Sequence, residues 1–398
     1  MLDGWLTLTG GDIASKITKG ASPRWQGFEY QNSGVLFVTS ENVRDGHIDL
    51  SAPKFLSEEF RLKMSSSELQ RGDILINIVG ASIGRVCMFD STYDSACINQ
   101  AVCMLRVKRE FHPPYFAYYL QAPFVRRRLL GSSSDSARPN LSLTDIREFQ
   151  FEVPPLPEQR KIAEILRTWD EALEACERLI EQKQRQRSAV RQKVFGCDGV
   201  PPEKWPSAKL SEIVERVQRQ ADGEEHPVMT ISGKSGFRRQ DEKFVRFMAG
   251  ESVSRYLLLK RGEFAYNKGN SKTFPQGCIY RLDQDTALVP FVYFAFALAE
   301  DLHSDFYAHL FASGFLNRQL TRLINSGVRN DGLLNIYSED FFGCVVPVPP
   351  RVEQERIGQL FNMFSVEIDG LMYQLERLRQ QKRGLMQRLL SGQWRVNV

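Results

Sequence analysis

Residues 153–162 read VPPLPEQRKI, and 195 residues later residues 348–357 read VPPRVEQERI. Each stretch is a proline-rich segment that ends in Glu-Gln and leads into a helical pattern. Proline is disfavoured in a helix interior but fits the first turn, where a glutamate also complements the positive end of the helix dipole. The two stretches therefore predict two helix starts and an internal repeat of the chain.

The residues after each start follow alternating steps of four and three. Sustained over about five heptads, this spacing predicts a coiled-coil seam, in helices of roughly 35 residues and about 50 Å each. The first helix supplies the seam residues Ile162, Leu166, Trp169, Leu173, Cys176, Ile180, Lys183, Arg187, Val190 and Val194, and the second supplies Ile357, Phe361, Phe364, Ile368, Leu371, Leu375, Leu378, Lys382, Leu385 and Leu389.

The segments before the two helices each have the length of one domain. The two segments share short sequence similarities, such as a tryptophan near each start, Trp5 and Trp205. They also contain short strand-like stretches at 34–39, 74–79, 102–107, 278–282 and 344–348. A helix is expected over 115–130. The predicted domains are 1–152, the helical spacer 153–198, a second domain at 199–347 and a second spacer at 348–398.

The predicted fold class is α+β, with two globular domains separated by a long antiparallel two-helix coiled coil and related by a pseudo-twofold axis. An alternative stays open, because Lys183, Arg187 and Lys382 place charge in the seam. In that alternative each helix packs on its own domain as a core helix.

Composition sets broad limits on function. The 398 residues are 42% hydrophobic, which is enough for two or three domains with cores, and the net charge of +4 is too small to indicate a nucleic-acid partner. Seven scattered cysteines show neither disulfide nor metal-ligand spacing. We see no membrane span or leader peptide, and a cytoplasmic location is expected.

The duplicated signature at 153–162 and 348–357, each copy preceded by a domain-sized segment, resembles the specificity subunit of type I restriction-modification systems over essentially the whole chain. Shorter motifs add to the resemblance, namely Trp5, Asp12-Ile13, Gly20-Ala21-Ser22-Pro23, Gly72-Asp73-Ile74-Leu75, Tyr256 and Tyr266-Asn267-Lys268. The second signature departs from the pattern at Arg351-Val352.

The resemblance implies a non-catalytic DNA-recognition subunit. Each domain would be a target-recognition domain that reads one half of a bipartite, asymmetric site, and the coiled coil would set the unread gap. The implied partners are double-stranded DNA, two methyltransferase subunits and two restriction/translocase subunits. S-adenosylmethionine, ATP and Mg²⁺ would be bound by those partners and not by this chain.

Basic and amide side chains near glycine-rich loops are candidate DNA contacts, because guanidinium and ammonium groups bind phosphates and guanine while amides pair with adenine. The candidates are Lys16, Lys19, Arg24, Arg44, Asn77, Ser82, Arg85 and Arg138 in the first domain, and Lys234, Arg238, Arg239, Asn267, Lys268, Asn270, Lys272 and Arg329 in the second.

Apolar residues outside the seam are candidates for docking helices of partner methyltransferase subunits. They are Ile165, Leu179, Leu360, Met363 and Met372. The alternative is that they pack against the chain's own domains.

Two rival functions are a self-contained adenine-N6 DNA methyltransferase or nuclease, and a coiled-coil scaffold that binds only protein. His112-Pro113-Pro114-Tyr115 resembles an amino-methyltransferase motif, but histidine cannot supply the required carboxamide. Gly233-Lys234-Ser235 has Val228 where a phosphate loop needs glycine. We find no metal-ligand spacing among the five histidines, and no catalytic or metal site is predicted.

Overall fold

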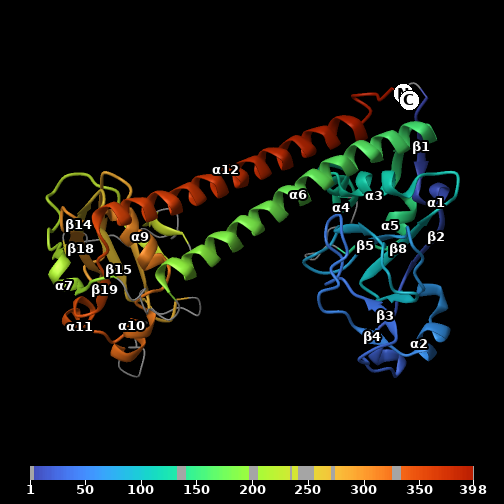
Figure 1. Ribbon diagram of the computed structural model, residues 1–398. Coiled ribbons are helices and arrows are strands. Elements are labelled where there is room, and N and C mark those ends of the chain that lie inside the picture. Colours follow the sequence, from blue (N-terminus) through green and yellow to red (C-terminus); the bar gives the residue numbers. More distant parts are fainter. Residues whose placement is uncertain are drawn as a thin grey trace. The chain divides into compact units, whose positions relative to one another are not determined.

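A computed structural model describes residues 4–131, 140–196, 205–233, 235–240, 255–269, 274–324 and 333–397. The chain divides into two compact units: unit 1 comprises Met1–Glu177 with Tyr373–Val398, and unit 2 comprises Arg178–Met372. Each unit contains one domain of mixed helices and strands and one end of each long helix, so the predicted α+β content is confirmed (Figure 1).

Unit 1 is built on a four-stranded antiparallel sheet of order β2-β8-β5-β6, beside a three-stranded sheet of order β4-β3-β7 and the pair β1-β9. The strands are β1 (Leu6–Thr9), β2 (Ala14–Lys19), β3 (Val35–Val38), β4 (Phe55–Leu56), β5 (Ile74–Asn77), β6 (Val86–Met88), β7 (Ala96–Ile98), β8 (Val102–Val107) and β9 (Gln150–Val153). The helices are α1 (Gly10–Ile13), η1 (Arg24–Gln26), α2 (Glu58–Lys63), η2 (Ser65–Ser67), α3 (Pro113–Gln121), α4 (Pro123–Gly131) and α5 (Leu143–Glu148).

Unit 2 repeats this plan. Its four-stranded sheet has the order β11-β18-β15-β16, and three two-stranded sheets, β10-β19, β12-β13 and β14-β17, accompany it. The strands are β10 (Ser207–Lys209), β11 (Val214–Arg216), β12 (Met229–Ser232), β13 (Gly236–Arg239), β14 (Leu257–Lys260), β15 (Phe264–Asn267), β16 (Cys278–Arg281), β17 (Thr286–Val289), β18 (Phe294–Leu298) and β19 (Val345–Pro347). The helices are α7 (Leu210–Ile213), α9 (Ser304–Ala312), α10 (Asn317–Leu323) and α11 (Ser338–Phe342).

The matching sheet order confirms the internal repeat, and all five strand-like stretches contain strands. The helix expected over 115–130 is wrong in one respect. It is broken into α3 and α4, because Pro123 disfavours a helical backbone at Ala122, which is extended at φ −61° and ψ 131°.

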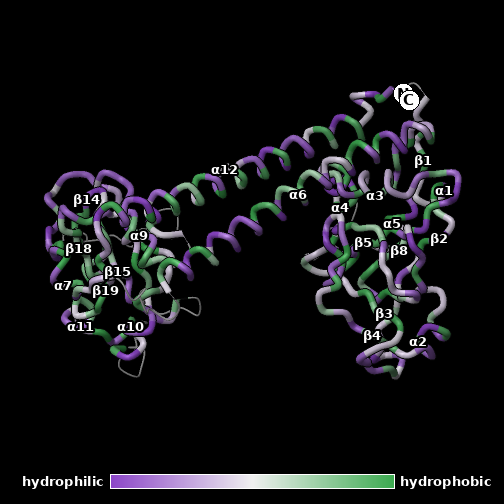
Figure 2. The backbone as a smooth tube through the Cα atoms, viewed as in Figure 1, coloured by the Kyte–Doolittle hydropathy of each residue, from purple (hydrophilic) through white to green (hydrophobic). Residues whose placement is uncertain are grey.

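The two long helices begin where the repeated stretches predict, as α6 (Leu156–Phe195) and α12 (Arg351–Leu390). Every predicted seam residue is buried or half-buried. Hydrophobic residues gather on the inner strands of each unit, whereas hydrophobic and hydrophilic residues alternate along both long helices (Figure 2). This alternation is the narrow apolar stripe of a coiled coil.

Within each unit the two helices run antiparallel. In unit 1, Asp170 pairs with Lys382, and Glu177 pairs with Arg379 at 2.6 Å. In unit 2, Lys183 pairs with Glu367 at 2.6 Å, and the ring of Phe195 stacks on that of Phe361, 5.5 Å between centroids. The residue numbers on α12 fall as those on α6 rise, which defines the direction.

The ends of the helices also belong to the domain cores. Ile162 and Leu166 of α6 join Leu389 of α12 in the main core of unit 1, and Phe195 of α6 joins Ile357 of α12 in the main core of unit 2. The ends of the long helices therefore pack as core helices, as the alternative prediction stated. At these ends the two helices also contact each other.

The Glu-Gln pair of each repeated stretch ties the first turn of its helix to the domain before it. Trp5 Nε1 donates to Glu158 Oε2 at 3.2 Å, and Gln159 accepts the His112 N–H at 2.9 Å while donating to the Pro154 carbonyl at 2.8 Å. Glu158 and Gln159 are each only 2% exposed. These hydrogen bonds satisfy the two buried polar side chains and join the start of the helix to the domain.

The second copy makes the same bonds. Trp205 Nε1 donates to Glu353 at 3.2 Å, and Gln354 accepts the His303 N–H and donates to the Pro349 carbonyl, both at 2.8 Å. The Arg351-Val352 departure leaves this local geometry intact.

The Gln354→Ala variant is expected to lower the free energy of unfolding by about 1–3 kcal/mol, because the Pro349 carbonyl and the His303 N–H lose their partner. Urea denaturation of the full chain measures the change. Gln359→Ala, at an exposed position of the same helix, is the control and should stay within about 0.5 kcal/mol of the parent. Equal effects of the two substitutions would contradict the stabilising role of the Gln354 hydrogen bonds.

Candidate nucleic-acid interface

Loops from four strands meet at one edge of unit 1. Lys19 at the end of β2 pairs with Cys103, and Asn77 at the end of β5 pairs with Val102. The Gly20 N–H donates to the Asn99 carbonyl at 3.1 Å, just after β7. We call this the loop edge of unit 1, comprising the loop that follows Lys19, the Ser40 turn, the β5–β6 turn at 78–85 and the turn at 99–101.

Unit 2 has the equivalent edge. Arg216 at the end of β11 pairs with Phe296, and Tyr266, next to the end of β15, pairs with Phe294. The loop edge of unit 2 comprises the segment after Arg216, the described residues after β12, and residues 268–269 and 274–277 between β15 and β16. Exposed loops at one edge of a rigid sheet are the usual place for binding residues.

Four predicted DNA contacts of the first domain lie in these loops with accessible side chains. Lys19 and Arg24 are exposed, and Ser82 and Arg85 are half-exposed in the β5–β6 turn. Lys16 is half-buried farther along β2. Arg44 lies in a different turn, where it pairs with Asp49 at 3.4 Å, so the structure does not bring Lys16 and Arg44 to the edge.

Asn77, a predicted DNA contact, lies inside unit 1. Asn77 is 0% exposed, and its Nδ2 donates to the Ser40 carbonyl at 2.9 Å and to Ser82 Oγ at 3.0 Å. Asn267 likewise joins two loops in unit 2. Its Nδ2 donates to the Ile231 carbonyl at 3.1 Å, and its Oδ1 accepts the Gly269 N–H at 2.9 Å. Both amides hold the loops together, with Asn77 buried and Asn267 half-buried.

The remaining predictions for the second domain are mixed. Arg238 and Arg239 are exposed on β13, while Lys268 is half-buried with its ammonium 5.0 Å from the centre of the Phe294 ring. Five candidates, Arg138, Lys234, Asn270, Lys272 and Arg329, lie outside the described residues.

Trp25 is an exposed aromatic residue that the sequence analysis did not single out. Trp25 is 91% exposed on η1, beside Arg24 in the loop that leaves the edge of unit 1. A tryptophan in a loop of Gly, Ser, Pro and Gln, away from any apolar periodicity, was the available signal. An exposed indole next to a guanidinium suits contact with an aromatic or anionic surface.

Comparison with known proteins shows what the chain is similar to. The family described as Type I restriction modification DNA specificity domain matches residues 3–183. The chain is 22% identical to the type I restriction enzyme MjaVIII specificity subunit of Methanocaldococcus jannaschii over 426 aligned positions, covering 98% of this chain and 93% of that protein. Residues 3–183 thus match the specificity-domain family, and the chain is similar to type I restriction enzyme specificity subunits over nearly its whole length.

Two further similarities agree with that family. The type I restriction enzyme EcoBI specificity subunit of Escherichia coli is 29% identical over 132 residues, which is 32% of this chain and only 27% of that protein. A solved structure from work on complex assembly and conformational transition of the type I restriction-modification system has a TM-score of 0.60 at 14% identity, covering 97% of each chain. The latter likeness shows the fold.

Four of the docking candidates have accessible side chains. Leu179, Leu360, Met363 and Met372 are exposed on the long helices. Ile165 is half-buried and packs against the main core of unit 1, so for this residue the structure favours packing on its own domain. Val352, Val366 and Tyr373 are further exposed apolar residues on α12 that the sequence analysis did not single out.

The methyltransferase-like motif is a helix start. Pro113 opens α3, and Tyr115 is 0% exposed with its hydroxyl donating to the Glu152 carbonyl at 2.7 Å. Burial raises the pKa of the Tyr115 hydroxyl. A tyrosine held in the core cannot stack on a base.

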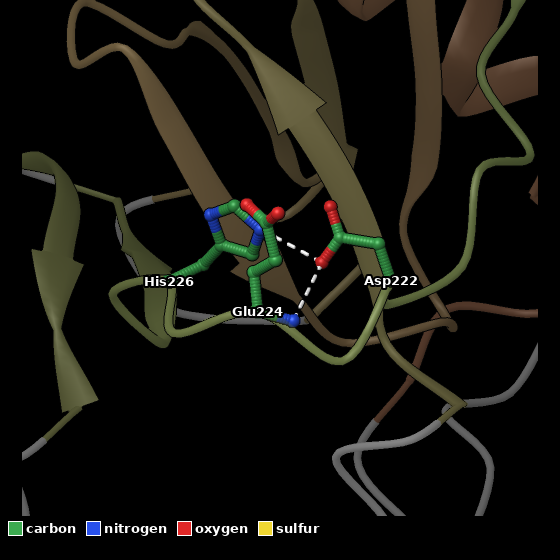
Figure 3. A group of neighbouring side chains, drawn as sticks. All are labelled: Asp222, Glu224 and His226. Atoms are coloured by element: carbon green, nitrogen blue, oxygen red, sulfur yellow. Dashed lines mark hydrogen bonds and ion pairs between the residues drawn. The ribbon is translucent and has the colours of Figure 1, made fainter.

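Among the described residues, Asp222, Glu224 and His226 come close enough to suggest a metal site (Figure 3). His226 is hydrogen-bonded through both ring nitrogens, to Thr286 Oγ1 and to Asp222 Oδ1, each at 2.9 Å. The Glu224 N–H also donates to Asp222 and lowers the pKa of that carboxyl. The cluster is explained as a hydrogen-bonded turn.

None of the helices in the described ranges combines the length and the hydropathy that a membrane span needs.

Asn77→Ala is expected to lower the free energy of unfolding by about 1–3 kcal/mol, because the Ser40 carbonyl and the Ser82 hydroxyl lose a buried donor. Asn32→Ala, in an exposed position of the same domain, is the matched control and should change it by less than about 0.5 kcal/mol. Chemical denaturation monitored by fluorescence measures both. An unchanged stability for Asn77→Ala would restore the base-reading interpretation.

Proposed function

We propose that this chain is the non-catalytic recognition subunit of a type I restriction-modification complex, and that each unit reads one half of a bipartite, asymmetric DNA sequence. The observation that carries the proposal is the repeated four-stranded sheet, since both copies present a loop edge of similar construction but different sequence. Similar edges favour similar modes of contact, and different side chains favour different half-sites.

The long helices are proposed to set the gap between the half-sites. Each has 40 residues, or about 60 Å at ~1.5 Å per residue, and DNA completes a turn about every 34–36 Å. In this proposal the two domains lie at opposite ends of one antiparallel coiled coil, related by a pseudo-twofold axis. The antiparallel pairing within each unit supports that arrangement.

Lys19, Arg24, Ser82 and Arg85 are the proposed contacts of the first domain, together with Trp25. Arg238 and Arg239 are those of the second, together with Lys234, Asn270, Lys272 and Arg329. Cationic side chains would bind phosphates and the edges of guanine, and so position each domain on the duplex.

Partner subunits are proposed to supply the chemistry. Two methyltransferase subunits would dock on the exposed apolar residues of α6 and α12 and would carry S-adenosylmethionine, and two restriction/translocase subunits would carry ATP and Mg²⁺. The complex would act in the cytoplasm. The buried Tyr115 is the observation against a self-contained methyltransferase.

Selection from random duplexes tests recognition. The purified chain, alone and with its co-expressed methyltransferase subunit, should enrich a single motif of two unlike halves with a fixed gap, and its affinity should fall with salt. Enrichment without sequence preference would support a protein-only scaffold instead. Methylation of DNA by the chain alone would overturn the non-catalytic role.

Trp25→Ala is expected to weaken DNA binding at least about tenfold, or ~1.4 kcal/mol, while stability changes by less than about 0.5 kcal/mol because the side chain is exposed. Titration of a labelled duplex gives the dissociation constant. Trp394→Ala is the matched control, because Trp394 is also exposed but stacks on Arg388. An equal loss of affinity for both variants would show that Trp25 has no special contact.

Leu360→Glu with Met372→Glu should abolish co-purification of the methyltransferase subunit, because two charges would enter an apolar interface. Gln359→Glu with Gln374→Glu adds the same charge at exposed positions of α12 and should leave co-purification intact. Affinity purification of the tagged chain from co-expressing cells measures both. Retention of the partner by the first double variant would refute docking at these residues.

A further inference from the structure

The three basic residues of the seam are not equivalent. Lys183 is neutralised by Glu367 at 2.6 Å, and Lys382 is neutralised by Asp170 and lies 5.4 Å from the centre of the Tyr118 ring. Arg187 forms no ion pair with any residue that the structure describes. It is half-buried, so its charge is neither fully solvated nor paired.

A second arginine lies one helical turn farther along α6. Arg191 is half-buried, and its Nε is buried without a hydrogen-bond partner. Its Nη1 donates to the Ala312 carbonyl at 3.3 Å, at the end of α9. Burial and the neighbouring charge of Arg187 both lower the pKa of Arg191. Two like charges four residues apart on a helix repel each other, and an unpaired buried charge is costly.

Both arginines line a cavity of about 520 Å³ that lies wholly within unit 2. Gln276, Ser313 and Asn317 contribute neutral polar groups to its wall, and Phe274 and Tyr280 contribute aromatic rings. Among the described residues of the lining none is acidic. The described part of the cavity wall therefore offers two guanidinium groups and no carboxylate to balance them.

The other copy of the repeat shows that the fold does not require these charges. The offset of 195 residues places Lys382 and Met386 at the positions of Arg187 and Arg191, and Ser365 at the position of Asp170. In unit 1, Lys382 forms an ion pair with Asp170, and Met386 is buried in the core. Unit 2 lacks the aspartate and carries a second arginine in place of the methionine.

We propose that the cavity of unit 2 binds a phosphate group, held by Arg187 and Arg191. Guanidinium groups form paired, charge-assisted hydrogen bonds with phosphate oxygens, and Arg191 Nε is a buried donor without a partner in this wall. The volume exceeds that of one phosphate ion, so a group attached to the phosphate has room beside Phe274 and Tyr280.

Two sources of the phosphate share this chemistry. Gly277 lines the cavity and belongs to the loop edge of unit 2, so a phosphodiester of bound DNA is one source, and this source rests on the proposed function. A free phosphate compound is the other. The experiment has one arm for each source.

In the first arm, thermal unfolding of the full chain is measured with inorganic phosphate and with chloride at equal ionic strength. Phosphate should raise the Tm of the parent by at least about 2 °C above chloride. Arg191→Met and Arg187→Met should lose this rise. Arg185→Met makes the same replacement at an exposed position of α6 and should keep it. This arm uses no DNA, so it stands whether or not the chain recognises DNA.

In the second arm, the affinity for a DNA duplex is measured against salt. If the phosphate belongs to DNA, Arg191→Met should reduce the slope of log affinity against log salt by about 0.9, the value for one phosphate contact, and Arg185→Met should leave it unchanged. A change in one arm alone supports the proposal and identifies the source. Equal behaviour of Arg191→Met and Arg185→Met in both arms overturns it and leaves Arg191 as a cap of α9.

Discussion

The buried Glu-Gln pair at the start of each long helix is the contact on which the architecture depends. Glu158 and Glu353 each accept a bond from a tryptophan that precedes the first strand of their domain, and Gln159 and Gln354 each join the start of α3 or α9 to the helix. These side chains fix the direction in which a helix leaves its domain. They act together with the core packing of the helix ends, such as Ile162 in unit 1 and Ile357 in unit 2.

A charge balance accompanies this contact. In unit 1, Arg395 holds Glu158 through two hydrogen bonds, at 2.8 and 2.9 Å, and its guanidinium lies 5.8 Å from the centre of the Trp5 ring. The buried carboxylate is thus paired, as the cost of an isolated charge requires. The two units are alike in backbone plan but differ in how they balance charge, and the same contrast appears at Arg187 and Arg191.

Periodic and local features were predictable from the sequence. The heptads of α6 and α12, their starts at 156 and 351, and strands such as β5 and β8 follow from apolar spacing and proline placement. Contacts between distant segments were not. Asn77 resembles a DNA contact because it directly precedes a glycine-rich turn, yet its partner Ser40 is 37 residues away. The entry of Met386 into the core of unit 1 also depends on tertiary packing that has no local signal.

The division of the chain into units has a consequence for synthesis. Unit 2 is one continuous segment, whereas unit 1 joins the first part of the chain to the segment that begins at Tyr373. The core of unit 1 is incomplete until the ribosome has made Met386, Leu389 and Leu390. Glu158 likewise gains its Arg395 partner only at the end of synthesis. The unit that is translated first is therefore completed last, and a premature stop at Tyr373 would remove the last segment of unit 1 while leaving unit 2 whole.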